Sequence, residues 1–309
     1  MKTVAAEKRT AIAIKNILYA TDFSPASIAA LPYARGIARL YGSKIHVLHV
    51  KQPTSYAFVT PDMVPYMLQM EEQLAEEQTE QIHKVFAGIP HYVFFGTGSL
   101  WNEVDEMIQS QAIDLIVIGT SGRTGASKML LGSVAAEILR RAPCPVLTVG
   151  PYCTGSAKEH LKIREILYAT DFSPESAAAA PYAYSFAQEN QAGLVLLNVI
   201  QQSHGVELVH PDQYVDSTWR RLQNLVPAEV ELWCTPTCIV TTGVPADEIL
   251  GLAEQRKPDL ILLGVKDVKN SMSVATHLSR ATAQHVIANA PCPVLTVRVP
   301  AKRSEPRLQ

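Results

Sequence analysis

Tyr19-Ala-Thr-Asp-Phe-Ser-Pro25 returns in the second half of the chain as Tyr168-Ala-Thr-Asp-Phe-Ser-Pro174. Two further stretches recur in the same order: Asp114-Leu-Ile-Val-Ile-Gly119 as Asp259-Leu-Ile-Leu-Leu-Gly264, and Pro143-Cys-Pro-Val-Leu-Thr-Val149 as Pro291-Cys-Pro-Val-Leu-Thr-Val297. A period this long indicates a duplicated domain, because the repeats of solenoids span about 20–50 residues. Each half therefore serves as a control for the other, and a motif kept in one half but lost in the other points to function.

The length of the chain fits two domains of ordinary size, since 309 residues with 47% apolar residues can fill two cores. We expect domains at residues 1–150 and 160–300. The linker Gly150–Glu159 is rich in Gly, Ser, Pro and Thr.

The composition argues against several classes of partner. A net charge of -2 gives no basic face for nucleic acid. No apolar run approaches the roughly 20 residues that cross a bilayer. Met1–Arg9 lacks the apolar core of a secretory signal. We therefore expect a cytoplasmic protein that binds neither nucleic acid nor membrane.

The cysteines and histidines form no metal-binding pattern. Cys144 and Cys292 stand between prolines at equivalent places in the two halves, which favours a core role. Cys234 and Cys238 leave a disulfide or metal pair open, although two incidental thiols are the favoured interpretation. His46 and His49 lie on a predicted strand and are interpreted as structural.

Strands and helices alternate along the first half. The pattern predicts strands at Ile17–Ala20, Lys44–Val50, Tyr92–Phe95, Leu115–Gly119 and Val146–Val149, with helices starting at Ser24-Pro25 and covering Met70–Val85, Leu100–Gln111 and Ser133–Arg141. The nearly all-apolar fourth strand is typical of a sheet that is covered on both faces.

The second half repeats this order. The predicted segments are Ile166–Ala169, Ala177–Gln188, Leu194–Val199, Gln213–Leu225, Ile239–Thr241, Ala246–Glu254, Leu260–Gly264, Thr276–Ala288 and Val294–Val297. The alternation predicts an α/β fold of two tandem, doubly wound, five-stranded parallel-sheet domains of the Rossmann-like kind.

The loop after the fourth strand carries the main functional signal. It reads Gly119-Thr-Ser-Gly122-Arg-Thr-Gly125-Ala-Ser-Lys-Met-Leu-Leu-Gly132-Ser133, a G-x2-G-x9-G-S spacing. Glycines let a ligand come close to the backbone. The helix that starts at Ser133 offers unpaired N–H groups to an anion, and Arg123 and Lys128 add positive charge. The loop has neither the G-K-[ST] ending of a Walker loop nor the dinucleotide G-x-G-x-x-G after the first strand.

Four features together resemble the ATP-binding subgroup of the universal stress protein family. They are the Thr21-Asp22-Phe-Ser24 turn, the His49-Val50 strand end, the glycine loop and the Pro-Cys-Pro-Val-Leu strand, and the resemblance covers both halves. It implies an adenine nucleotide alpha hydrolase-like fold with strand order 3-2-1-4-5. Strands 1 and 4 are then neighbours at the switch point, where ligands bind outside the carboxyl ends of the strands.

The resemblance also implies roles for single residues. Asp22, in the turn with Thr21, would bind the ribose hydroxyls, and Ala20 and Val50 would lie against the adenine. Gly119 and Gly122, followed by Gly125, would let the nucleotide approach. Gly132, Ser133 and the amide of Val134 would hold the phosphates of ATP, with Mg²⁺ expected at the phosphates. Ala20 departs from the Pro of some members, but a backbone contact would survive that change.

Structural explanations remain open for each of these residues. Asp22 also fits a helix-stabilising role, since Asp171 repeats it. Gly119 also fits a tight strand exit, and Arg123 and Lys128 also fit solvated loop charges.

The glycine loop is eroded in the second half. Asp267 stands where Gly122 stands in the first, and its charge would disfavour a triphosphate. Counting back from Pro291, Arg280-Ala281 replaces Gly132-Ser133. We expect a folded second domain with no ATP site or a weaker one, while Lys266, Lys269 and Arg280 leave another anion open.

Three functions compete on this basis. The first is a nucleotide-dependent regulatory or stress-response module with ATP in the first half. The second is a slow ATP hydrolase, although no general base or nucleophile–base pair is visible and Glu137 lies on a helix that leads away from the phosphates. The third is a nucleotide-free scaffold or chaperone-like protein.

Assembly follows from the fifth strands. Val146–Val149 and Val294–Val297 would be exposed apolar edges, and such edges need cover. The two halves could pair there as an intramolecular pseudo-dimer, and a homodimer of whole chains is also plausible.

Overall fold

The computed structural model describes residues 12–51, 60, 62–120, 131–153, 161–201, 211–265 and 275–299. In the first half the elements are β1 Asn16–Ala20, α1 Pro25–Tyr41, β2 Lys44–Lys51, α2 Val64–Val85, β3 His91–Thr97, α3 Leu100–Ser110, β4 Leu115–Gly119, α4 Ser133–Arg141 and β5 Val146–Val149. In the second half they are β6 Glu165–Ala169, α5 Pro174–Asn190, β7 Gly193–Ile200, α6 Pro211–Gln223, α7 Ala228–Glu231, β8 Thr237–Thr242, α8 Pro245–Arg256, β9 Leu260–Gly264, α9 Ala275–Asn289 and β10 Val294–Val297.

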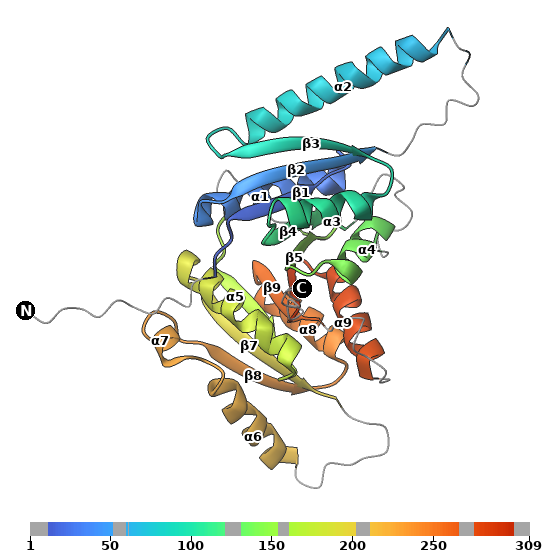
Figure 1. The fold of residues 1–309 in the computed structure, drawn as a ribbon. Coiled ribbons are helices and arrows are strands. Elements are labelled where there is room, and N and C mark those ends of the chain that lie inside the picture. The colour runs from blue at the N-terminus through green and yellow to red at the C-terminus, as the bar shows by residue number, and fades with distance from the viewer. Residues whose placement is uncertain are drawn as a thin grey trace, which may run out of the picture.

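The strands form one continuous sheet rather than two separate ones. Its order is β3-β2-β1-β4-β5-β10-β9-β6-β7-β8, with ten strands in the described part of the chain. The first half has the predicted order 3-2-1-4-5, and the second half mirrors it (Figure 1). The α/β architecture with parallel sheets is therefore confirmed.

The two halves join at β5 and β10, which pair antiparallel with Leu147 opposite Leu295. The hydroxyl of Thr148 donates to the carbonyl of Val294 at 3.0 Å, and that of Thr296 donates to the carbonyl of Val146 at 3.2 Å. The two bonds are reciprocal, as expected when a pseudo-twofold axis relates the two halves. The apolar edges expected at these strands cover one another inside the chain, and the sheet ends instead at β3 and β8.

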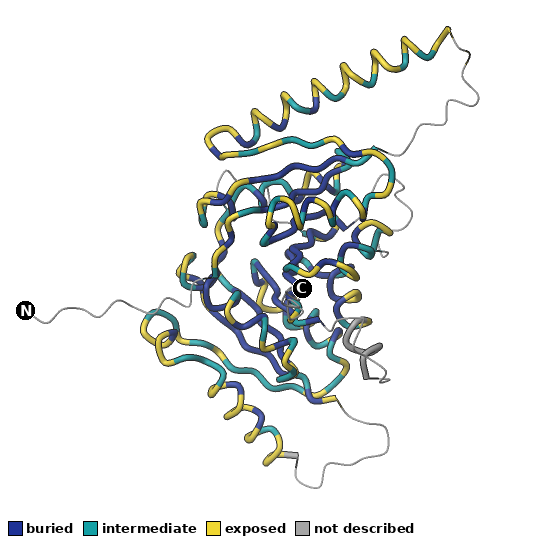
Figure 2. The backbone as a smooth tube through the Cα atoms, viewed as in Figure 1, coloured by how far each residue is buried: buried dark blue, intermediate teal, exposed yellow. Residues whose placement is uncertain are grey.

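The apolar residues form one shared core and two local ones. The shared cluster lies on the face covered by α1 and α5 and includes Ala34, Tyr19, Ala183 and Tyr168. Across the join, the hydroxyls of Tyr41 and Ser185 lie 3.2 Å apart. On the opposite face, α3 and α4 pack on the first half and α8 and α9 on the second. Figure 2 shows the buried strands running through the middle of the molecule. The halves are therefore packed together as well as paired.

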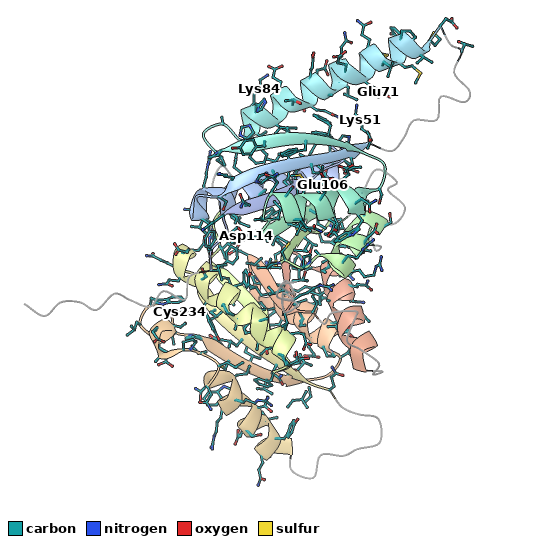
Figure 3. All side chains as sticks on the ribbon, in the orientation of Figure 1. Lys51, Glu71, Lys84, Glu106, Asp114 and Cys234 are labelled. Carbon is teal, nitrogen blue, oxygen red and sulfur yellow. The ribbon has the colours of Figure 1, made fainter. Side chains whose placement is uncertain are left out.

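Asp114 explains one of the recurring sequence stretches, because it fixes the start of β1 beside β4. Its carboxylate accepts the backbone N–H groups of Lys15 at 2.7 Å and Asn16 at 3.0 Å (Figure 3). Asp259 accepts the N–H of Arg164 at 2.6 Å in the second half. The repeated aspartate is thus a structural residue.

Helix α2 differs from the prediction, since it begins at Val64 rather than at Met70. In its first turns, Tyr66 is 57% exposed and Leu68 is 52% exposed. Because these turns bury no apolar face, the sequence has no helical apolar pattern that marks the start of the helix. Figure 1 shows the helix extending along the outer strand β3 and beyond it. Lys51 of β2 lies 3.9 Å from Glu71 and holds the helix by a weak ion pair (Figure 3).

The cysteines are free thiols, so the disulfide alternative for Cys234 and Cys238 is not formed. Cys292 is buried. The thiol of Cys144 is partly removed from solvent, and this burial raises its pKa to about 12. Both of these thiols pack against core clusters, which agrees with the core role expected for them.

Candidate functional site

The turn after β1 is held at the carboxyl end of the sheet by β2. The N–H of Thr21 donates to the carbonyl of Leu48 at 2.9 Å, and Nδ1 of His49 lies 2.8 Å from the carbonyl oxygen of Thr21. Ala20 ends β1 beside these residues, and Val50 follows His49 along β2. The structure thus brings together the residues expected to contact adenine and ribose.

Asp22 shapes this turn. Its Oδ1 accepts the N–H of Ser24 at 2.9 Å, and Phe23 adopts a left-handed φ of 57°. Thr21 Oγ1 accepts the N–H of Phe23 at 3.0 Å, and Ser24 caps α1 by accepting the N–H of Ser27. A turn fixed by this many short-range bonds presents its carboxylate in a defined place before any ligand binds.

The second half builds the same turn. Asp171 Oδ1 accepts the N–H of Ser173 at 3.0 Å, and Phe172 has a φ of 60°. The amide of Asn198, in the place of His49, donates to the carbonyl of Thr170 at 2.7 Å. The geometry of Asp22 therefore has a structural explanation common to both halves, and its binding of ribose stays a prediction. Sequence reasoning missed that His49 and Asn198 hold the turn, although their matching positions were a usable signal.

Gly119 at the end of β4 touches the start of α1. A Cβ added there would lie 2.4 Å from the carbonyl oxygen of Ala26 and 2.6 Å from its carbonyl carbon. At Gly264, the matching Cβ would lie 2.2 Å from Cα of Ser176. Helix-to-strand packing therefore requires a glycine in both halves, whatever further role Gly119 has toward a ligand.

The start of α4 is where the two halves differ. Gly132 is its N-cap residue, and no side chain caps the helix among the described residues. The N–H of Gly132 donates to the carbonyl of Thr120 at 2.7 Å, which places the helix start at the end of β4. Ser133 begins the helix, and Val134 is 48% exposed. The first N–H groups of a helix have no partner within it, so this turn can receive an anion.

In the second half the corresponding backbone lies inside a helix. Counting from Pro143 and Pro291, Ser133 matches Ala281, yet α9 begins at Ala275, six residues earlier. The N–H groups at Arg280 and Ala281 thus point into helical turns that are already formed. A helix start is absent at the phosphate position of this half.

Part of the predicted loop lies outside the described residues, namely Gly122, Arg123, Gly125 and Lys128, together with Lys266, Asp267 and Lys269 of the second half. Among the described residues, no three His, Cys, Asp or Glu side chains gather in a way that could hold a metal ion. Within the same residues, no helix is long and apolar enough to cross a membrane.

The second half has a small cavity of about 90 Å³ at the matching end of its sheet. Asp171, Val199 and Gly264 line it, and Thr282 of α9 closes one side. Sequence analysis predicted the loss of the phosphate site but gave no sign of this cavity.

The sheet is doubly wound. At the carboxyl ends of β1 and β4 it has a turn, a glycine that ends the strand and a helix start. These features define a nucleotide-binding type of α/β protein. The family model "Universal stress protein family" matches residues 13–150 and 162–298. The chain belongs to the universal stress protein family, and it carries two copies of the family's fold.

Known proteins support this assignment. Universal stress protein MJ0531 of Methanocaldococcus jannaschii is 30% identical over 148 residues, which are 44% of this chain and 81% of the relative. Universal stress protein A homolog 1 of Coxiella burnetii is 34% identical over 141 residues, 44% of this chain and 95% of the relative. The crystal structure of a universal stress protein from Archaeoglobus fulgidus covers 92% of this chain and 98% of its own, with 25% identity and a TM-score of 0.68.

Proposed function

We propose that the chain is a nucleotide-dependent regulatory module of the stress response, with ATP bound in the first half. The observation that carries this proposal is the contrast between α4 and α9. Among the described residues, no side chain caps the first turn of α4, which starts at the end of β4, whereas α9 runs through the matching position. Two halves with the same fold thus differ at the place where phosphates would bind.

In this proposal adenine lies against Ala20 and Val50, and Asp22 binds the ribose hydroxyls. The N–H groups at Ser133 and Val134 hold the phosphates, because a helix N-terminus carries a partial positive charge. Mg²⁺ would be held chiefly by the phosphates, as Mg²⁺ usually keeps few protein ligands at nucleotide sites. The ATP-bound state would change the contacts that the protein makes with its partners.

Glu137 is the acidic residue of α4, and a hydrolase would need such a group as a base near the phosphates. Its Oε1 lies 2.9 Å from Arg141 and 3.8 Å from Arg140, and this pairing holds it along the helix. We therefore propose binding rather than rapid turnover, with slow hydrolysis and the nucleotide-free scaffold as the alternatives. We further propose a cytoplasmic protein, with a homodimer of whole chains as one possible assembly.

The test is to denature freshly purified protein and identify the released nucleotide, with its ratio to chain. We expect about one ATP per chain. Mostly ADP would favour the hydrolase, and two nucleotides per chain would contradict the difference between the halves. No nucleotide, even after Mg-ATP is added, would leave the scaffold alternative.

Matched variants assign the site to one half. Asp22→Asn and Asp171→Asn both keep an Oδ1 acceptor for the turn but remove the negative charge. Loss of a charge-assisted hydrogen bond should weaken ATP binding about tenfold or more in Asp22→Asn. Asp171→Asn should bind like the parent protein. Equal loss in both variants would contradict a single site in the first half.

A further inference from the structure

Two histidines lie in contact where α2 leads into β3. Nδ1 of His83, in the last turn of α2, is 2.7 Å from Nε2 of His91, the first residue of β3, and the ring centroids are 4.9 Å apart. His83 is exposed, and His91 is partly exposed. This contact lies at the amino ends of the strands, because His91 pairs with Ile45 near the start of β2 (Figure 1). It is therefore at the opposite edge of the sheet from the proposed nucleotide site.

The hydrogen bonds of His91 determine which of its nitrogens can act as a ligand. Nδ1 of His91 lies 2.7 Å from the carbonyl oxygen of Ile89, and a carbonyl oxygen can only accept. Nδ1 therefore carries a hydrogen, and in the neutral ring Nε2 has a lone pair directed at His83. Histidines that bind metal ions are usually oriented in the same way, by a bond from the second ring nitrogen to a carbonyl or carboxylate. His91 is thus already held in the form that a metal ion needs.

The separation of the two nitrogens fits one coordination geometry better than another. Imidazole nitrogens bind metal ions at about 2.0–2.1 Å, so two of them lie about 2.9 Å apart at a right angle and about 3.4 Å apart at a tetrahedral angle. The observed 2.7 Å is close to the first value. Right angles are typical of Cu²⁺ and Ni²⁺, whereas Zn²⁺ prefers the tetrahedral arrangement. A rotation of the exposed His83 ring would let both nitrogens face one ion.

The fold does not require this pair. By the pairing of β2 with β3 and of β7 with β8, Pro236 of the second half takes the place of His91. The helix α6, which corresponds to α2, contains no histidine. The second half thus builds the same sheet without the two imidazoles. A feature kept in one half and lost in the other again points to function.

We propose that His83 and His91 bind a divalent metal ion that takes imidazole ligands at right angles, Cu²⁺ or Ni²⁺. Nδ1 of His83 and Nε2 of His91 are the two protein ligands, and water fills the remaining positions. The hydrogen of His83 moves through solvent from Nδ1 to Nε2, so both rings stay neutral. Lys84 follows His83, but Glu80 compensates its charge at 2.7 Å (Figure 3).

A bound ion would join α2 to β3. Within the described structure, the buried residues of this helix are Gln78 and Ile82, and its ion pair with Lys51 is weak. A metal link at His83 would therefore anchor the C-terminal end of a helix that has few other contacts with the sheet.

Isothermal titration of the full chain with NiCl₂ tests the proposal, because Ni²⁺ does not oxidise free thiols as Cu²⁺ can. The protein carries no polyhistidine tag. We expect about one Ni²⁺ per chain and weaker binding of Zn²⁺. His83→Gln and His91→Gln should each weaken Ni²⁺ binding at least about tenfold, since even the outer partners of metal ligands contribute that much. Unchanged binding in a folded variant would overturn the site, and tighter binding of Zn²⁺ would overturn the geometry.

Two controls separate this site from others. His285→Gln removes another exposed helical histidine, on α9, and should leave Ni²⁺ binding unchanged. Asp22→Asn, in which ATP binding should be weakened, should bind Ni²⁺ like the parent protein, so the inference does not depend on the proposed ATP site. Loss of Ni²⁺ binding in either control would place the ion at α9 or at the nucleotide and contradict the proposal.

Two further measurements show whether both histidines bind the same ion. The electron paramagnetic resonance spectrum of bound Cu²⁺ should show coupling to two imidazole nitrogens in the parent protein and to fewer in His83→Gln. Ni²⁺ should also slow amide hydrogen exchange in the last turns of α2 in the parent protein but not in His83→Gln. Coupling to a single nitrogen, or exchange that Ni²⁺ does not change, would contradict a shared site.

Discussion

At the scale of single residues, Gly119 and Gly264 show how a glycine can be required by packing alone. Both alanine variants would place a Cβ within 2.4 Å of backbone atoms in the first helix of their half. We expect Gly119→Ala and Gly264→Ala to lower the free energy of unfolding by about 1–3 kcal/mol, the usual cost of overpacking. Urea unfolding followed by circular dichroism measures this change.

Gly251 is the control for that prediction. It is exposed within α8, and an added Cβ there would meet nothing within 4 Å. Gly251→Ala should raise the free energy of unfolding by about 0.5–1 kcal/mol, since alanine is the better helix former. If all three variants behave alike, the close approach at Gly119 and Gly264 does not explain their presence.

His46 is buried and stacks on Tyr92, with ring centroids 5.5 Å apart. Within the described structure its Nδ1 has no hydrogen-bond partner. Burial, and secondarily the charge of Lys44, hold the pKa of His46 below its ordinary value of 6.5. The unfolded chain thus takes up a proton as the pH falls through about 6.5 while the folded protein resists it, so stability falls with pH in that range.

The variant His46→Phe keeps a ring in the stack and removes this titration. We expect the loss of unfolding free energy between pH 7.5 and pH 5.5 to be smaller in His46→Phe than in the parent protein. Urea unfolding at the two pH values measures the difference. An equal loss in both proteins would show that other groups cause the pH dependence.

At the scale of elements, the end of α4 depends on a residue from the other half. The carbonyl of Leu139 would accept the N–H four residues on, but that residue is Pro143, which has none. Arg298 donates to this carbonyl instead. In the other half, Gly150 stands at the position that matches Arg298, and it lies near Ile287, which matches Leu139. A Cβ added to Gly150 would be 3.1 Å from the carbonyl oxygen of Ile287.

Arg298→Met should therefore destabilise the protein by about 1.5–3 kcal/mol, the range for a hydrogen bond to a charged group. Arg256→Met is the control, because the ion pair of Arg256 with Glu165, at 3.2 Å, is partly exposed and contributes at most about 1 kcal/mol. Thermal and urea unfolding of the two variants measure the difference. Equal effects would mean that the helix end does not need Arg298.

The sequence predicted most elements because alternating apolar strands and capped helices are local signals. Ser24 and Ser173 cap α1 and α5 where the Ser-Pro pairs indicate, and the strands fall within a few residues of their predicted positions. The start of α2 was missed because its first turns bury no apolar face. The contact of Gly119 with Ala26 joins residues far apart in the chain, and such steric demands have no signature in a single sequence.

The proposed site was predicted only in part for a similar reason. The glycine spacing and the Ser133 helix start can be seen in the sequence, and the structure brings that helix start to the end of β4. The helix α9 was predicted to within one residue, from Thr276 to Ala288, but the sequence analysis did not use its early start to explain the loss of the phosphate position. A cavity of about 280 Å³ between Ala136 of α4 and Ala283 of α9 arises only when the two halves meet.

At the scale of the whole molecule, the shared core should make unfolding a single event. One cluster contains residues from α1 and from α5, and β5 pairs with β10. We expect Trp101 fluorescence in a Trp219→Phe/Trp233→Phe variant, which reports only the first half, to give the same urea midpoint as circular dichroism, which reports both. Separate midpoints would show that the halves unfold independently.

The antiparallel join of β5 and β10 has a further consequence for concentration dependence. Two separate chains joined by such a short pairing would dissociate on dilution, following mass action. Here a covalent connection keeps the partners at a high effective concentration at any dilution. Each molecule therefore always contains one half with a helix start at the end of β4 beside one half whose helix runs through the matching position, in a fixed ratio that neither expression level nor exchange between chains can alter.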